Sequence, residues 1–128
     1  MPKEIDIKQR CVNIDWLEVY VLESRDHYPC NADYFRRCGY LVDEREYGTR
    51  VYKEMFTLVD SQGNPLIEVR RNPKSGDSNF NGLVPESSHI RLPNWMLYQG
   101  NPVDYLREFL LKHDYIFKRI YRIDIAYD

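Results

Sequence analysis

The residues best suited to chemistry lie near the C-terminus, where the sequence contains Arg122-x-Asp124-x-x-x-Asp128. Side chains two residues apart on a strand share a face at about 6.6 Å, so Arg122 can pair with Asp124. Asp128 shares that face about 13 Å from Asp124, too far for the two carboxylates to hold one metal ion directly. The pattern indicates either an ion pair on a solvated strand or part of a larger acidic site.

A further acidic residue, Asp15, precedes Trp16 in an apolar segment near the N-terminus. A buried carboxylate needs a partner, and Arg122 could supply it. If the first and last strands pair, Asp15 approaches Asp124, and the two could bind a hard divalent cation. We interpret Trp16 as a core residue rather than as a stacking platform.

Basic residues in the middle of the chain are candidates for contacts with nucleic acid. Arg70 and Arg71 precede Lys74 and a loop rich in Gly, Ser and Asn, which suits phosphate contact. This basic surface could be extended by arginines that lie farther away in the sequence, namely Arg36, Arg37, Arg45, Arg50 and Arg91. The alternative interpretation is that these basic residues only form the solvated end of a hairpin.

Several common catalytic patterns are absent from the sequence. The histidines fall in separate segments and match no zinc-binding spacing; His89, which alternates with Arg91, is the one with a polar neighbour on its strand. There is no P-loop and no G-x-S-x-G motif. A stand-alone small-molecule enzyme is therefore disfavoured.

Length and composition limit the class of protein. The 128 residues are enough for one domain, and 43% hydrophobic residues exclude general disorder. No apolar run reaches the roughly 18 residues of a membrane span, and no secretory signal is visible. The net charge of −2 gives no overall attraction to nucleic acid. The cysteines form no C-x-x-C pair, so we expect reduced thiols and a cytoplasmic location. Because no apolar run is long enough to span a membrane, we expect no membrane partner.

Alternation and turn residues predict a sheet with one or two helices. Asn31 could cap a helix over 32–37, and Asn101-Pro102 is typical of the start of a helix that ends near His113. Residues 72–87 are expected to form a long polar loop. Strands are expected over 11–22, 40–46, 50–59, 66–71, 88–92 and 115–128.

The last strand alternates clearly from Tyr121 onward. Its sequence predicts that Tyr121 shares an apolar face with Ile123 and Ile125, while Arg122 and Asp124 lie on the polar face. Together the elements predict a single α+β domain, mainly antiparallel, with the helices packed on one face. A split β-α-β, ferredoxin-like arrangement is one way to build it.

The two ends of the chain resemble one family. The segments V-N-I-D-W-L-E-V (residues 12–19) and Y-R-I-D-I-A-Y-D (residues 121–128) resemble the replication initiation factor family. These proteins are the rolling-circle replication and transfer initiators of plasmids, phages and conjugative elements. In that family an early D-W-L strand is followed, after a helix, by an R-x-D-x-A-x-D strand, as it is here.

The resemblance implies a DNA nickase in which a tyrosine becomes joined to the 5′ phosphate at the origin. It implies Mg²⁺ or Mn²⁺ as cofactor, with Asp15, Asp124 and Asp128 as metal ligands. Arg122 would orient Asp124 or hold a phosphate, which makes these two the expected catalytic residues. Origin DNA is the expected partner. A second copy of the chain, in a homodimer, is a further candidate partner.

The nucleophilic tyrosine of such an enzyme is expected downstream of Asp128. We therefore expect residues 1–128 to be the N-terminal part of a longer replication initiation protein, inactive alone. The alternative is a non-catalytic α+β module whose aromatic face binds a protein or single-stranded nucleic acid. Aromatic residues make up 14% of the chain, which suits that alternative.

Overall fold

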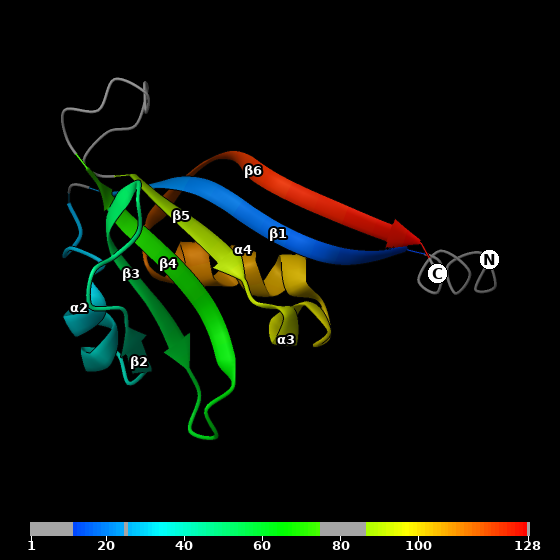
Figure 1. The fold of residues 1–128 in the computed structure, drawn as a ribbon, viewed down its shortest axis with the longest axis horizontal. Coiled ribbons are helices and arrows are strands. Elements are labelled where there is room, and N and C mark those ends of the chain that lie inside the picture. The colour runs from blue at the N-terminus through cyan, green and yellow to red at the C-terminus, as the bar shows by residue number, and fades with distance from the viewer. Residues whose placement is uncertain (1–11, 25, 75–86, 128) are drawn as a thin grey trace.

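The computed structural model describes residues 12–24, 26–74 and 87–127, which form one α+β unit (Figure 1). Six strands make one sheet in the order β2-β3-β4-β5-β1-β6, and each ladder between them is antiparallel. The expected α+β class is confirmed. The elements are β1 (Val12–Glu23), α2 (Ala32–Arg37), β2 (Leu41–Glu44), β3 (Tyr52–Val59), β4 (Pro65–Pro73), β5 (Ser87–Leu92), α3 (Asn94–Leu97), α4 (Pro102–Lys112) and β6 (Tyr115–Tyr127).

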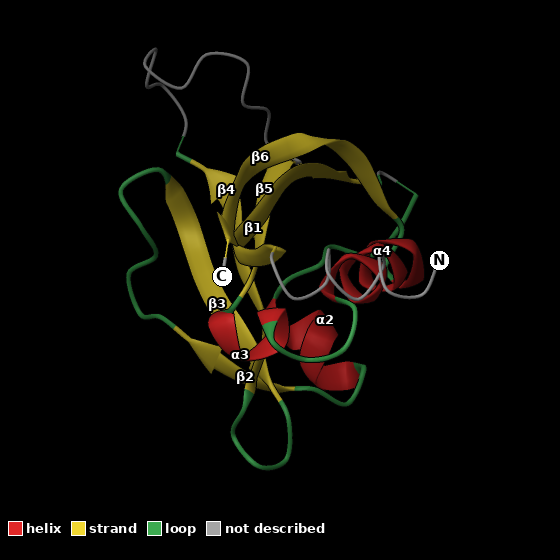
Figure 2. Ribbon diagram, turned by 90° about the vertical axis from the view of Figure 1, so that its right-hand side faces the viewer, coloured by secondary structure: helices red, strands yellow, loops and turns green. Residues whose placement is uncertain are grey.

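The helices pack on one face of the sheet (Figure 2). Strands β5 and β6 both run antiparallel to β1, which lies between them, and α3 and α4 connect them. This is one split β-α-β unit, as expected. The remaining strands form a meander from β2 to β5, so the complete sheet differs from a ferredoxin-like one. No helix in the described part of the chain is long and apolar enough to cross a membrane.

Side-chain caps fix where two helices begin. The Asn31 side chain accepts a hydrogen bond from the Tyr34 amide at 2.8 Å, and that of Asn101 from the Asp104 amide at 3.2 Å. Pro102 occupies the first turn of α4, where its missing N–H costs nothing. Both helices were expected. The short helix α3 was not, because it follows Pro93 without a side-chain cap.

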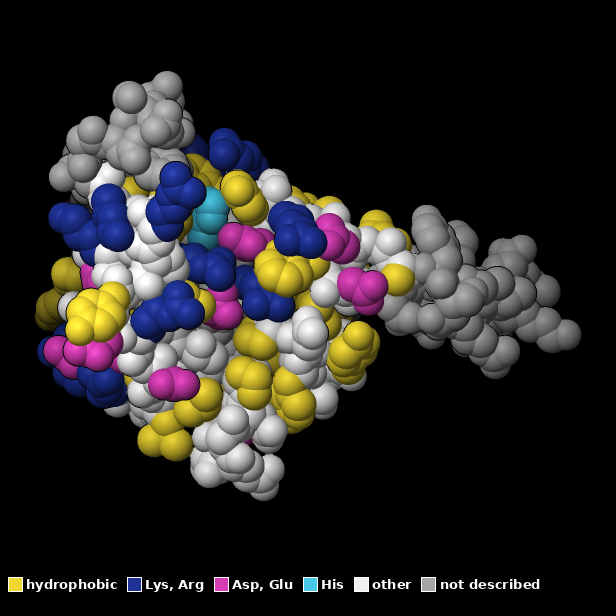
Figure 3. Space-filling model, in the orientation of Figure 1, with side chains coloured by type: hydrophobic (Ala, Val, Ile, Leu, Met, Phe, Trp, Pro, Cys, Tyr) yellow, Lys and Arg dark blue, Asp and Glu magenta, His cyan; other side chains and the backbone are white. Residues whose placement is uncertain are grey.

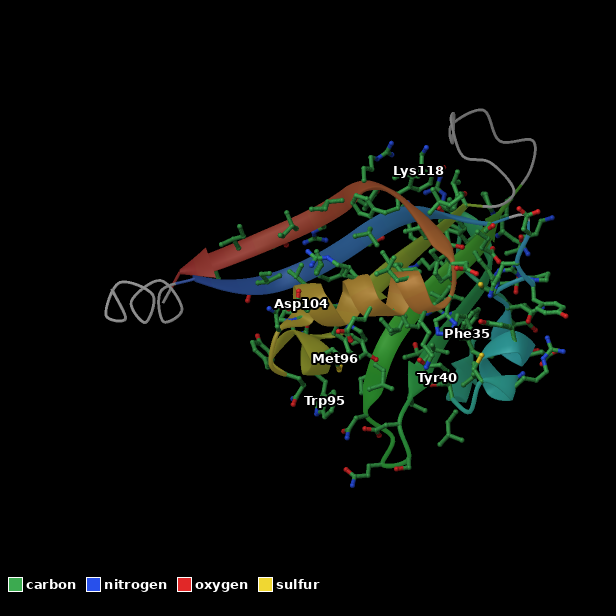
Figure 4. All side chains as sticks on the ribbon, turned by 180° about the vertical axis from the view of Figure 1, so that it is seen from behind. Phe35, Tyr40, Trp95, Met96, Asp104 and Lys118 are labelled. Carbon is green, nitrogen blue, oxygen red and sulfur yellow. The ribbon has the colours of Figure 1, made fainter. Side chains whose placement is uncertain are left out.

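The hydrophobic core lies between the sheet and the helices. Phe35 of α2 stacks on Phe109 of α4 with ring centroids 5.8 Å apart, and Figure 4 labels Phe35 between these helices. Leu17 and Val19 of β1 contribute the sheet side of this core, each at most 3% exposed. Because the core occupies one face, alternate residues of the same strands are left for the opposite face.

Strands β1 and β6 form a long ribbon that extends past the other strands (Figure 1). Their register shifts at three places, where Asp15, Lys118 and Tyr121 are extra residues without a direct partner. Such bulges redirect side chains. The predicted alternation is therefore wrong at Tyr121. Ile123 lies opposite Leu17 on the core face, whereas the Tyr121 ring contacts His89 on the other face.

Candidate nucleic-acid interface

The face of the sheet opposite the helices carries most of the polar candidates, and we call it the open face. Register pairs Glu18 with Arg91 and Tyr20 with His89 across β1 and β5. It also pairs Arg70 of β4 with His89, which extends the face across three strands. Figure 3 views this face and shows basic side chains gathered around a histidine.

Trp16 lies under two guanidinium groups. Arg91 from β5 is 3.7 Å from the ring centroid, and Arg122 from β6 is 4.1 Å from it. Arg122 also donates hydrogen bonds to both Asp124 oxygens, at 3.2 and 2.7 Å, which confirms the expected ion pair. The interpretation of Trp16 as a core residue is wrong, because the ring is part-exposed and serves as a platform for these cations.

Glu18 is a buried carboxylate, 4% exposed, at the centre of the open face. It accepts hydrogen bonds from Trp16 Nε1 at 3.1 Å and from His89 Nδ1 at 3.1 Å, with Arg70 Nη1 at 3.6 Å. Burial alone would raise the pKa of Glu18, but the hydrogen bonds from His89 and Trp16, together with the charge of Arg70, lower it. Glu18 therefore stays ionised and holds the proton of His89 on Nδ1.

Beside this carboxylate lies a cleft of about 390 Å³, which we call the Arg cleft. Its basic side chains are Arg50, Arg70 and Arg119, and its one carboxylate is Glu18, so the lining carries a net charge of +2 with histidine neutral. The full lining is Glu18, Thr49, Arg50, Val51, Tyr52, Arg70, His89, Arg119 and Tyr121. A cleft with this charge favours anionic ligands, in a chain whose net charge is −2.

Two residues of β6 give the Arg cleft its aromatic and cationic wall. Tyr121 is 54% exposed, and its ring centroid is 4.3 Å from that of His89. The Arg119 guanidinium lies 4.9 Å from the centroid of the Tyr20 ring, which holds the cation beside the cleft. The combination of guanidinium groups and an exposed ring can contact both phosphate and base.

The expected metal ligands do not come together. The register places Trp16, not Asp15, opposite Asp124, and Asp15 is an exposed residue in a bulge. Both Asp124 oxygens accept from Arg122, whose hydrogen bond lowers the pKa of Asp124. Asp128 lies outside the described residues. Among those described, no three His, Cys, Asp or Glu side chains form a group suited to a metal ion. Mg²⁺ or Mn²⁺ as a cofactor stays a prediction of the resemblance.

The expected basic surface is divided between the two faces. Arg70 lines the Arg cleft, but Arg71 lies on the helix-covered face, where its guanidinium is bound by Glu23 and Glu54 at 2.8–3.2 Å. The prediction that Arg70 and Arg71 share one surface is wrong, because neighbouring strand residues point in opposite directions. Lys74 is exposed where β4 ends, outside the cleft lining.

Sequence reasoning missed Glu18, Arg119 and Tyr121 as members of the site. Glu18 and Arg119 belong to strands at opposite ends of the chain, so only the register brings them together. Tyr121 reaches the open face through a bulge. The alternation of apolar and polar residues in the sequence of β6 does not reveal this bulge. For His89, the alternation with Arg91 on β5 was a usable signal.

Comparisons with protein-family models, with curated proteins and with solved structures find no match to this chain.

Proposed function

We propose that the Arg cleft binds the backbone of single-stranded DNA, and that the chain is a domain of a replication initiation protein. The observation that carries the binding proposal is the convergence of Arg50, Arg70, Arg119 and Tyr121 on one cleft of about 390 Å³. Guanidinium groups bind phosphate oxygens, and exposed aromatic rings stack on bases. We propose DNA as the ligand because the sequences of the two end strands resemble those of replication initiators.

Single-stranded nucleic acid fits this surface better than a duplex. The open face is a sheet that presents an exposed ring at the cleft, and stacking on a ring needs an unpaired base. No described helix is placed on this face for insertion into a major groove. We therefore expect tighter binding to a single strand than to the same sequence as a duplex.

The binding proposal is tested by fluorescence anisotropy with a labelled oligothymidylate at low and moderate salt. Replacing Arg119 by Ser should weaken binding about tenfold, because one charge-assisted phosphate contact is lost. The matched control is Arg107→Ser on α4, an exposed arginine that does not line the cleft. Wild-type affinity in Arg119→Ser, or an equal loss in Arg107→Ser, would contradict the proposal.

The nicking activity implied by the resemblance needs a separate experiment. We propose that Arg122 and Asp124, which form an exposed ion pair on β6, act in phosphodiester transesterification in the longer protein. The assay is nicking of a supercoiled plasmid that carries the element's own origin, with Mn²⁺, by the product of the whole reading frame. If the unaltered protein nicks the plasmid and the Asp124→Ala variant does not, the result supports the proposal of a replication initiator. Absence of nicking by the unaltered protein favours the non-catalytic binding module.

A further inference from the structure

One nitrogen of the His89 ring, Nε2, takes no part in the hydrogen bonding of the described residues. The ring's Nδ1 donates to Glu18 at 3.1 Å, while Nε2 is shielded from water and has no hydrogen-bond partner among the described residues. We propose that His89 anchors a single-nucleotide subsite in the Arg cleft, where Nε2–H donates to a phosphate oxygen and the base stacks on Tyr121. This inference rests on the proposed function and assigns the atom that holds the phosphate.

The contact between Nδ1 and the Glu18 carboxylate fixes the orientation of the His89 imidazole. Glu18 is held by the hydrogen bond from Trp16 and by its burial on β1, so its carboxylate cannot turn away from His89. A histidine whose Nδ1–H is bound by a carboxylate can offer only Nε2 to a ligand. A buried polar atom without a partner is uncommon in folded proteins and calls for an explanation. A bound phosphate oxygen supplies one.

The volume and charge of the Arg cleft fit one nucleotide unit. A volume of about 390 Å³ lies at the lower end of the range for small-molecule pockets, roughly 300–1,000 Å³. The net charge of +2 on the lining favours a phosphate over a neutral ligand. Arg70 and Arg119 approach from strands on either side of His89, so both can share a phosphate with it.

Tyr121 is the side chain that must move to admit the ligand. Its ring packs against the imidazole at 4.3 Å but is 54% exposed, so a change of rotamer costs little buried area. The bulge frees this residue from a cross-strand partner on β1. Once turned aside, the ring stays at the edge of the cleft, where a base can stack on it.

Binding also involves a proton. A neutral imidazole has a lone pair on Nε2, so His89 must be protonated to donate to a phosphate. The titratable and charged groups around it in the cleft are Glu18 and Tyr20 from β1, Arg50 from the segment before β3, Tyr52 from β3, Arg70 from β4, and Arg119 and Tyr121 from β6. The negative charge of a bound phosphate attracts the protonated ring.

The direct test is nuclear magnetic resonance of the histidine ring nitrogens in the full chain. The probe is the dinucleotide d(TpT), whose single phosphodiester does not itself titrate near neutral pH. We expect the Nε2 resonance of His89 to move towards the protonated position as d(TpT) is added, while His27 and His113 remain unchanged. Inorganic phosphate should produce a smaller shift of the same sign, and thymidine alone should produce none.

A matched pair of variants tests the role of the single atom. His89→Asn keeps an amide near the position of Nδ1, which preserves the bond to Glu18, but has no atom at the position of Nε2. His89→Gln places an amide near Nε2. We expect d(TpT) to bind about tenfold more weakly to His89→Asn and less than threefold more weakly to His89→Gln, as for loss of one charge-assisted hydrogen bond (roughly tenfold).

The outcomes separate the subsite from the proposed function. If Arg119→Ser loses oligothymidylate binding while His89→Asn binds d(TpT) as the wild type does, the subsite is overturned and the DNA cleft stands. An unchanged His89 resonance at saturating d(TpT) overturns the subsite in the wild-type protein, whatever the stability of the variants. If the wild type binds no oligothymidylate, both proposals fall.

Discussion

At the scale of single residues, burial separates the arginines that hold the fold together from those that are free to act. Arg71 is 8% exposed and donates to Glu23 and Glu54 on two other strands, so it joins β1, β3 and β4. Arg122 is exposed and its pair with Asp124 lies within one strand. These two were grouped with DNA-binding and catalytic residues on the basis of sequence, and their surroundings now distinguish them.

Substitution of Arg71 should therefore be far more costly than substitution of Arg122. Arg71→Ala leaves the Glu23 carboxylate buried and uncompensated, so we expect the free energy of unfolding to fall by about 3 kcal/mol. Arg122→Ala should leave it nearly unchanged, because exposed ion pairs contribute little. Urea denaturation followed by circular dichroism measures both. Equal losses in the two variants would show that burial does not separate these residues.

At the scale of secondary-structure elements, the sequence predicted the units better than their alignment. The strand segments and both capped helices were identified because alternation, turn residues and the Asn caps are local signals. The open face could not be identified in the same way. Glu18 meets His89 only through the register of β1 with β5, and Tyr121 joins them through a bulge in β6. Register and bulges depend on how distant strands pack.

The cap of α4 gives a test at this scale. Asn101→Ala removes the acceptor for the Asp104 amide, and we expect a loss of about 1 kcal/mol in the free energy of unfolding. The control is Asn94→Ala, which makes the same chemical change at an exposed first residue of α3, where no side chain caps the helix. Thermal or urea denaturation distinguishes the variants. A larger loss in Asn94→Ala would contradict the assigned role of Asn101.

At the scale of the whole molecule, one buried histidine between two helices should make the free energy of unfolding depend on pH in the acid range. His113 is 1% exposed where α4 ends, and its Nδ1 lies 2.9 Å from the hydroxyl of Tyr34 in α2. Burial, with a smaller effect of Lys112, lowers the pKa of His113 from 6.5 to about 4. The folded protein therefore resists protonation of a group that the unfolded chain protonates readily.

The sign of the pH dependence follows from this difference. Between the unfolded pKa of 6.5 and the folded pKa of about 4, the unfolded chain binds more protons at this site. We expect the free energy of unfolding to be highest above that window and to decrease as pH falls through it. Urea denaturation across the window measures the effect. His113→Gln, although less stable at neutral pH, should show a smaller decrease; an equal decrease would assign the acid sensitivity to other groups.

The bulge at Tyr121 has a consequence for how such a site can be inherited. Ile120 pairs with Val19 and Arg122 with Glu18, which are adjacent on β1, so loss of the codon for residue 121 would remove this one bulge and leave every other side chain of β6 on its present face. A deletion elsewhere in a strand normally turns one end over. The aromatic wall of the cleft can therefore be gained or lost in one mutational event, and lineages carrying the same fold can differ in it.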